Sequence, residues 1–230
     1  MRHHSFNDGD TLARSLAADV ASSLARRLAA QGEASLVVSG GRTPVPFLRE
    51  LGRQPLDWPR VHVTLADERR VPQGDAASNF ALVRDAFAGT SAADARLVGV
   101  DAMADDAAER WNALVSALPR PFAAVVLGMG DDGHFASLFP GMPGLAAALA
   151  STGTTGAAAV VEGVAPVEPR ARLSLTLATL LDTDLLALHV TGASKLATLQ
   201  RASQPGSALE MPVRALLAQR RAQLELYHAP

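Results

Sequence analysis

The sequence predicts an α/β fold, a three-layer sandwich in which helices cover both faces of a mostly parallel sheet. One observation behind this prediction is that short runs of β-branched and leucine residues alternate along the chain with segments of helical periodicity. Such alternation requires crossover connections, which are typical of parallel strands. The other is that 48% of the 230 residues are hydrophobic, which is enough for a sizeable core. We therefore expect one domain over residues 1–230.

The first predicted elements are an amphipathic helix and a buried strand. Leucine or valine recurs at every fourth position across residues 11–30, which marks one stripe of a helix, and Gly32 is suited to end it. A short apolar run at 36–38 follows and stops abruptly at two glycines, which predicts a buried strand.

Further strands and helices then alternate. Strands are predicted at 61–65, 123–127, 173–177, 185–190 and 223–227. The last of these is expected nearer an edge, because its apolar residues alternate with polar ones. Helices are predicted at 44–53, 79–87, 105–118, 193–202 and 212–219. The most loop-like stretch covers residues 146–159.

Composition excludes several classes of protein. The formal net charge is −2, without the basic excess expected of a nucleic-acid binder. The absence of cysteine excludes disulfides, thiolate nucleophiles and cysteine-ligated metals, and it is compatible with a reducing compartment. No segment has the roughly 20 apolar residues that span a bilayer, and no apolar signal segment follows the N-terminus. We expect a soluble, cytoplasmic protein that binds neither nucleic acid nor membrane and needs no obligate protein partner.

Ligands of open parallel sheets bind beyond the carboxyl ends of the strands, so the residues after each strand are the candidates for chemistry. Gly40 and Gly41 follow the first strand, and Pro44 suits the first turn of a helix. A glycine turn that leads into a helix N-terminus can bind an anion, to which Arg42 would add a charged fork. A simple tight turn is the alternative, since the spacing matches neither a P-loop nor a dinucleotide motif.

Two further strand ends carry charges. Asp67, Glu68, Arg69 and Arg70 follow the strand at 61–65, where they form either a solvated loop or a set of opposite charges that orient one another at a site. Another strand ends at a Thr-Gly pair, and Lys195 falls in the first turn of the next helix. A cation there opposes the helix dipole unless an anion shares the site, so Lys195 indicates either a phosphate contact or an exposed lysine.

The most informative strand end covers residues 128–134. Three closely spaced glycines allow backbone N–H groups to approach a ligand and to stabilise an oxyanion. His134 ends this turn, and the ordinary histidine pKa of about 6.5 suits a general base. Asp132 lies two residues earlier, where a carboxylate can orient the imidazole.

The other histidines are weaker candidates. His62 and His189 lie inside predicted strands, which indicates core or surface positions. His3 and His4 are expected to be disordered, and His228 lies near the end of the chain. No two histidines have the spacing of an H-E-x-x-H motif, so no metal site is expected.

These blocks, in this order, resemble the 6-phosphogluconolactonase family. The resemblance covers residues 39–44, 67–72, 128–140, 172–176 and 191–195. It implies hydrolysis of 6-phospho-D-glucono-1,5-lactone to 6-phospho-D-gluconate, the second step of the oxidative pentose phosphate pathway, with neither a metal nor an organic cofactor. It also implies a fold like that of the glucosamine-6-phosphate deaminase/ribose-5-phosphate isomerase superfamily.

The same resemblance implies roles for individual residues. His134 would be the general base that activates water, with Asp132 as its catalytic neighbour. The residues that would contact this small sugar-phosphate substrate are Gly40, Gly41, Arg42, Thr43, Asp67, Arg69, Gly130, Arg172 and Lys195.

Three alternatives remain. A glucosamine-6-phosphate deaminase would carry a catalytic glutamate where Phe139 stands. A serine hydrolase using Ser39 would need a G-x-S-x-G elbow, whose first glycine is absent. A non-catalytic sugar-phosphate sensor would keep the glycine turns and cations but would need no base such as His134.

Overall fold

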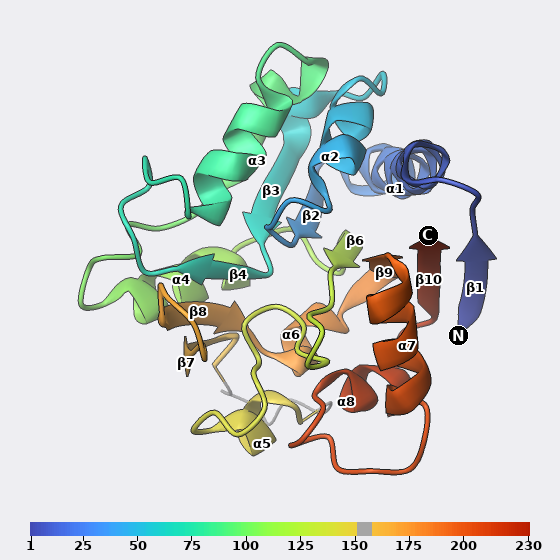
Figure 1. Ribbon diagram of the computed structural model, residues 1–230. Coiled ribbons are helices and arrows are strands. Elements are labelled where there is room, and N and C mark those ends of the chain that lie inside the picture. The colour runs from blue at the N-terminus through green and yellow to red at the C-terminus, as the bar shows by residue number, and fades with distance from the viewer. Residues whose placement is uncertain (151–157) are drawn as a thin grey trace.

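A computed structural model of the chain describes residues 1–150 and 158–230, and its main sheet is entirely parallel. Its seven strands lie in the order β1–β10–β9–β6–β2–β3–β5, which confirms the predicted mostly parallel sheet (Figure 1). These strands are β1 (Arg2–Ser5), β2 (Ala34–Val38), β3 (Val61–Leu65), β5 (Arg96–Val98), β6 (Phe122–Leu127), β9 (Thr183–Thr191) and β10 (Leu224–Ala229).

A second, antiparallel sheet extends from the end of β3. It contains β4 (Asp67–Arg69), β8 (Ala171–Leu175) and β7 (Val160–Val164), with β8 in the middle. The strand predicted at 173–177 therefore belongs to this small sheet and lies two residues earlier in the chain. It stops there because α6 (Leu177–Leu180) begins directly after Thr176.

The predicted helices are all present, with ends that differ by at most two residues. Helix α1 begins at Gly9 because Asp8 accepts a 2.6 Å hydrogen bond from the N–H of Thr11, and it ends at Gly32, where φ is 82°. The helices are α1 (Gly9–Gln31), α2 (Val45–Gly52), α3 (Asn79–Phe87), α4 (Ala107–Ser116), α5 (Leu145–Ala148), α6, α7 (Ala193–Ala202) and α8 (Val213–Ala218), with 3₁₀ turns η1 (Trp58–Arg60) and η2 (Ser91–Asp94).

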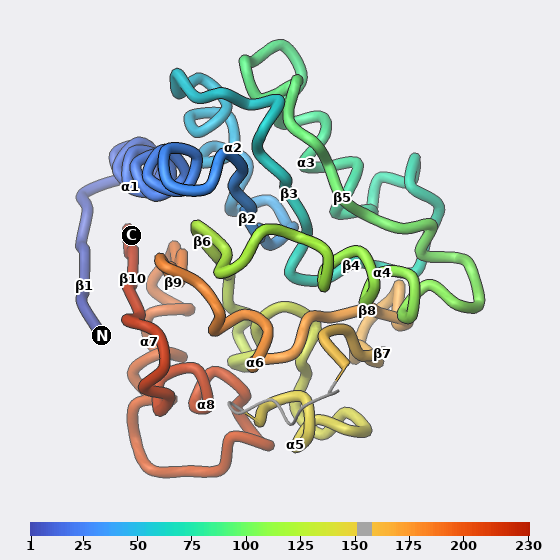
Figure 2. The backbone as a smooth tube through the Cα atoms, turned by 180° about the vertical axis from the view of Figure 1, so that it is seen from behind, coloured from blue at the N-terminus to red at the C-terminus, as the bar shows by residue number. Residues whose placement is uncertain are grey.

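Helices cover both faces of the main sheet. Helices α1 and α2 lie on one side of the row of strands and α6 lies on the other, as Figure 2 shows from behind. On the side opposite α1, Trp111 of α4 donates a 3.2 Å hydrogen bond to the hydroxyl of Thr64 in β3. The three-layer prediction is thus confirmed.

The N-terminal residues differ from expectation. His3 and His4, predicted to be disordered, lie in the edge strand β1, which pairs with β10. The His4 ring stacks on Tyr227 with centroids 4.7 Å apart, and its Nε2 lies 2.8 Å from the Glu225 carboxylate. Four largely exposed polar residues show no hydrophobic period, so β1 leaves no mark in the sequence pattern. Strand β10 is consequently next to the edge.

The loop predicted at 146–159 is described only in part. Its first residues belong to α5, and residues 151–157 lie outside the described part of the chain. None of the helices formed by the described residues is both long and apolar enough to span a membrane.

Candidate active site

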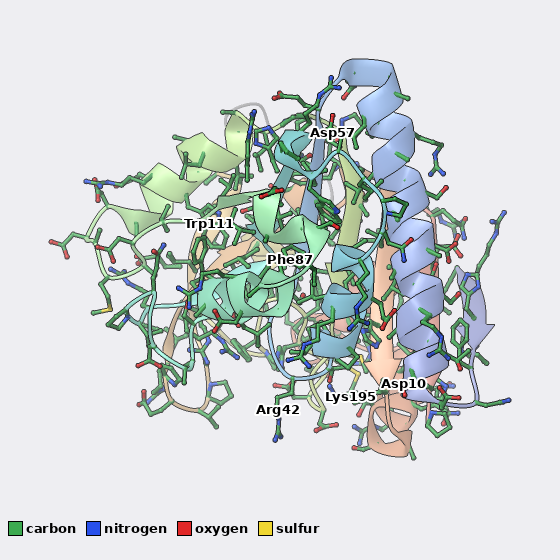
Figure 3. The ribbon with its side chains drawn as sticks, turned by 90° about the horizontal axis from the view of Figure 1, so that it is seen from above. Asp10, Arg42, Asp57, Phe87, Trp111 and Lys195 are labelled. Atoms are coloured by element: carbon green, nitrogen blue, oxygen red, sulfur yellow. The ribbon has the colours of Figure 1, made fainter. Side chains whose placement is uncertain are left out.

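The carboxyl ends of β2, β3, β6 and β9 surround an open cavity of about 420 Å³. Figure 3 shows Arg42 and Lys195 at this end of the molecule, opposite Asp57. Nine of the sequence-predicted site residues line the cavity: Gly40, Gly41, Arg42, Thr43, Asp67, Arg69, Gly130, His134 and Lys195.

The His134 ring is oriented by Asp132. Its Nδ1 lies 2.5 Å from Oδ1 of Asp132, and the same oxygen accepts a 3.0 Å hydrogen bond from the backbone N–H of His134. An ionised carboxylate can only accept hydrogen bonds, so this contact places the ring proton on Nδ1. Nε2 then carries the lone pair, which is the arrangement that a general base needs.

The charge of Asp132 is maintained by the same contact. Partial burial raises the pKa of the Asp132 carboxyl, but the hydrogen bonds from the His134 ring and backbone outweigh it and bring the pKa below its ordinary value. The carboxylate therefore remains ionised beside the imidazole in neutral solution.

The glycine turn that contains His134 is stabilised by hydrogen bonds between its own backbone groups. The N–H of Gly130 donates to the carbonyl of His134 at 2.9 Å, and the N–H of Gly133 donates to the carbonyl of Gly130 at 3.0 Å. A Cβ atom on residue 130 would lie 2.1 Å from Cε1 of the His134 ring. Glycine is required at this position because the imidazole occupies the space of any side chain.

Buried hydrogen bonds hold the acidic strand end in place. Asp67 is 7% exposed, and its carboxylate accepts a 2.6 Å hydrogen bond from the hydroxyl of Ser137. Its carbonyl oxygen accepts a 2.8 Å hydrogen bond from the Asn79 side chain. Asp67 is therefore fixed against the cavity rather than solvated.

Glu68 has a structural place behind the cavity. Its carboxylate accepts hydrogen bonds from the N–H groups of Asn79 and Phe80, which begin α3, and from the hydroxyl of Ser78. Burial raises the pKa of Glu68, against the effect of these hydrogen bonds. Glu68 thus joins the start of α3 to β4 and fixes the strand on which Asp67 and Arg69 lie.

Hydrogen bonds connect the start of α7, which follows β9, to the glycine turn that holds His134. Lys195 lies in the first turn of α7 and lines the cavity. The neighbouring Ser194 hydroxyl donates a 3.0 Å hydrogen bond to the Asp131 carboxylate, and Thr198 donates one of 3.0 Å to the carbonyl of Asp131. These contacts set the distance between Lys195 and the turn that holds His134.

Arg172 is the one predicted substrate contact that the structure leaves off the cavity wall. It faces Arg69 across the β4–β8 pairing and is 5% exposed. Burial lowers the pKa of Arg172, and the charge of Arg69 lowers it further. Its predicted contact with substrate remains a prediction.

Several residues on the cavity wall were not predicted as site residues, and two of them are buried polar side chains of particular interest, Asn79 and His189. Asn79 begins α3 and is 1% exposed; His189 lies in β9 and is 4% exposed. His189 was interpreted as a core or surface group because it lies within an apolar strand. Its position two residues before the end of β9, where ligands of parallel sheets bind, was the available signal.

The described residues offer no ready metal site. Within 1–150 and 158–230, no three histidine or acidic side chains gather closely enough to hold a metal ion. The groups present suit acid–base chemistry on an anionic ligand: one oriented imidazole, several cations and glycine turns at strand ends. The fold and cavity thus define an α/β enzyme for anionic substrates.

Comparisons with known proteins identify the family. Residues 7–225 match the family described as glucosamine-6-phosphate isomerases/6-phosphogluconolactonase. The 6-phosphogluconolactonase of Pseudomonas aeruginosa is 47% identical over 221 residues, which cover 95% of this chain and 90% of that protein. The chain therefore belongs to this family, as the sequence predicted.

Solved structures agree. A crystal structure of a 6-phosphogluconolactonase from Shewanella baltica has a TM-score of 0.93 and 36% identity, and the match covers 100% of this chain and 98% of that one. A monomeric glucosamine-6-phosphate deaminase has a TM-score of 0.78 at 20% identity, with 98% of this chain and 97% of that one covered. This second likeness shows the fold alone, and that fold is the one the sequence predicted.

Proposed function

We propose that this chain hydrolyses 6-phospho-D-glucono-1,5-lactone to 6-phospho-D-gluconate, the second step of the oxidative pentose phosphate pathway, with His134 as general base. Relatives and structural neighbours named 6-phosphogluconolactonase support this activity. The observation that carries the role of His134 is the 2.5 Å contact from its Nδ1 to Asp132, which leaves Nε2 free to take a proton.

In the first step, Nε2 of His134 takes a proton from water while that water attacks the lactone carbonyl. The resulting oxyanion needs preorganised donors. Gly130 and Gly133 already donate their N–H groups within their own turn, so the donors we assign to the oxyanion are the backbone N–H groups of residues 40 and 41. In the second step, the imidazolium returns its proton to the departing ring oxygen, and the ester bond breaks.

The cations of the cavity bind the substrate's phosphate and orient the lactone. Arg42, Arg69 and Lys195 all line the cavity, and they come from three different strand ends. A phosphate held away from the reacting carbon fixes the carbonyl relative to His134, which lowers the entropic part of the barrier. Arg172, buried beside Arg69, adds its charge to the field at this end.

The surroundings of His134 disfavour the deaminase. The ring of Phe139 lies 4.3 Å from the imidazole, centroid to centroid. An apolar ring therefore stands where the deaminase would place a carboxylate to carry a second proton.

We also propose that residues 1–230 work as one domain in the cytoplasm, without an obligate partner. All four strand ends that form the cavity belong to this chain, and a chain without cysteine is compatible with a reducing compartment.

The test is the rate at which 6-phosphogluconate appears from freshly made 6-phosphogluconolactone. Wild type, His134→Ala and a protein-free blank are run side by side, because the lactone also opens unaided. We expect wild type to exceed the blank by orders of magnitude, and His134→Ala to lose about a hundredfold to ten-thousandfold of that rate. A wild type that matches the blank while binding 6-phosphogluconate would instead be a sensor.

A further inference from the structure

His189 is a buried histidine on the cavity wall that the mechanism above does not use. It lies in β9, the strand that leads to the turn before Lys195. Its ring meets the ring of Phe47 in α2 edge to face, with centroids 6.4 Å apart. The imidazole is thereby held between the apolar layer under α2 and the cavity.

The ring has no hydrogen-bond partner in the described part of the chain. Nδ1 of His189 is fully buried and unpaired. A buried acceptor without a partner costs less than a buried N–H without one, so the ring proton belongs on Nε2. The Nε2–H group is then a donor without a partner in a residue that lines the cavity.

The ring is also neutral. Burial lowers the pKa of His189 to about 4, and the charge of Lys195 contributes to the same shift. At neutral pH the wall of the cavity therefore carries both a cation, Lys195, and an uncharged donor, His189, near enough for the charge of Lys195 to affect the His189 ring. A group that satisfies both must accept several hydrogen bonds and carry negative charge, which describes a phosphate.

We propose that Nε2–H of His189 donates a hydrogen bond to the substrate phosphate that Lys195 binds, which makes His189 a phosphate-binding residue. The proposal rests on the proposed function for the identity of the substrate. A neutral donor suits this position because a second cation would have to lose its hydration beside Lys195, whereas an uncharged N–H does not. The rest of the sugar then extends along the cavity toward His134.

The experiment compares His189→Leu, which removes the donor, with His189→Gln, whose side-chain amide keeps one. The matched control is His62→Gln, a strand histidine outside the cavity. Steady-state kinetics with 6-phosphogluconolactone give KM and kcat, and calorimetry gives Kd for 6-phosphogluconate and for gluconate, which lacks the phosphate.

We expect His189→Leu to raise KM and the Kd for 6-phosphogluconate by about tenfold or more, as loss of a hydrogen bond to a charged group does. kcat should stay within about twofold, because the contact is present in both ground and transition states. His189→Gln should recover most of the affinity, and His62→Gln should match wild type. Binding of gluconate should be unchanged in all variants.

Other outcomes separate the two proposals. If the wild type shows no turnover, the proposed function is overturned. If His189→Leu then still binds 6-phosphogluconate more weakly than the wild type does, the role of His189 stands. An equal loss of affinity for gluconate, or a fall in kcat at constant KM, would overturn the role of His189. If His189→Leu does not fold, ¹⁵N NMR of the wild-type ring decides: an Nε2 signal that does not move when 6-phosphogluconate is added contradicts the proposal.

Discussion

The free lone pair of His134 depends on one neighbouring carboxylate. Asp132 is only two residues away and also accepts the backbone N–H of His134, so the ring orientation is set within a single turn. The tautomer is decided by charge as well as by geometry, because only an acceptor at Nδ1 keeps the proton there.

Replacing Asp132 by asparagine is accordingly expected to lower kcat about tenfold to a hundredfold, part of what general acid–base catalysis supplies. An amide can turn its NH₂ group toward Nδ1, which favours the tautomer with the proton on Nε2 and removes the lone pair from the reacting side. KM should change little, since Asp132 does not line the cavity. Steady-state kinetics on the lactone provide the measurement.

The control for this substitution is Asp57→Asn. Asp57 is on the surface at the far end of the molecule, where its side chain is 53% exposed (Figure 3). The Asp57→Asn substitution should leave kcat unchanged. An Asp132→Asn variant that kept the wild-type kcat would mean that the carboxylate does not set the tautomer.

At the scale of elements, the turn after β6 can hold the His134 ring in its observed position because Gly130 has no side chain in the space of the imidazole. Gly130→Ala is expected to lower kcat roughly a hundredfold, the typical effect of moving a catalytic group by about 1 Å. The new Cβ would lie 2.1 Å from Cε1 and 2.2 Å from Nδ1 of His134, so the ring must move. The φ angle of residue 130 is not in the left-handed region, so the fold should persist, with circular dichroism and the unfolding midpoint close to wild type.

Gly74→Ala is the matched control, because a Cβ there meets no atom within 4 Å. It should retain full activity. If Gly130→Ala were as active as Gly74→Ala, the ring position in the structure would not be the one used in catalysis.

The elements themselves show where a sequence can be interpreted and where it cannot. The main strands and helices were predictable because apolar runs of different period alternate along the chain. In the small sheet only β8 was predicted; β4 was missed because Asp67–Arg69 has the composition of a solvated loop and becomes a strand only by pairing with β8. Long-range pairing of this kind leaves no local pattern.

For the whole molecule, nine of the predicted site residues line one cavity, and they could be selected from the sequence because polar groups after apolar runs are conspicuous. His189 was missed for the opposite reason: it lies inside an apolar strand that is buried on both faces. In such a strand, periodicity does not tell which side chain reaches a cavity. Arg172 illustrates the converse, since it matches the motif but is not among the residues that line the cavity.

The buried, neutral His189 also affects the stability of the whole molecule. Its pKa is about 4 when folded, against an ordinary value of 6.5. As pH falls below 6.5 the unfolded chain binds a proton that the folded chain refuses, so the free energy of unfolding decreases, by up to about 3 kcal/mol at pH 4. Above pH 6.5 the His189 ring is neutral in both the folded and the unfolded chain, so it no longer changes the free energy of unfolding. Urea denaturation of wild type and His189→Gln between pH 7 and pH 4 measures it: the stability of wild type relative to the variant should fall by about this amount. A constant difference across that range would show that the folded protein accepts the proton on His189 as readily as the unfolded chain does.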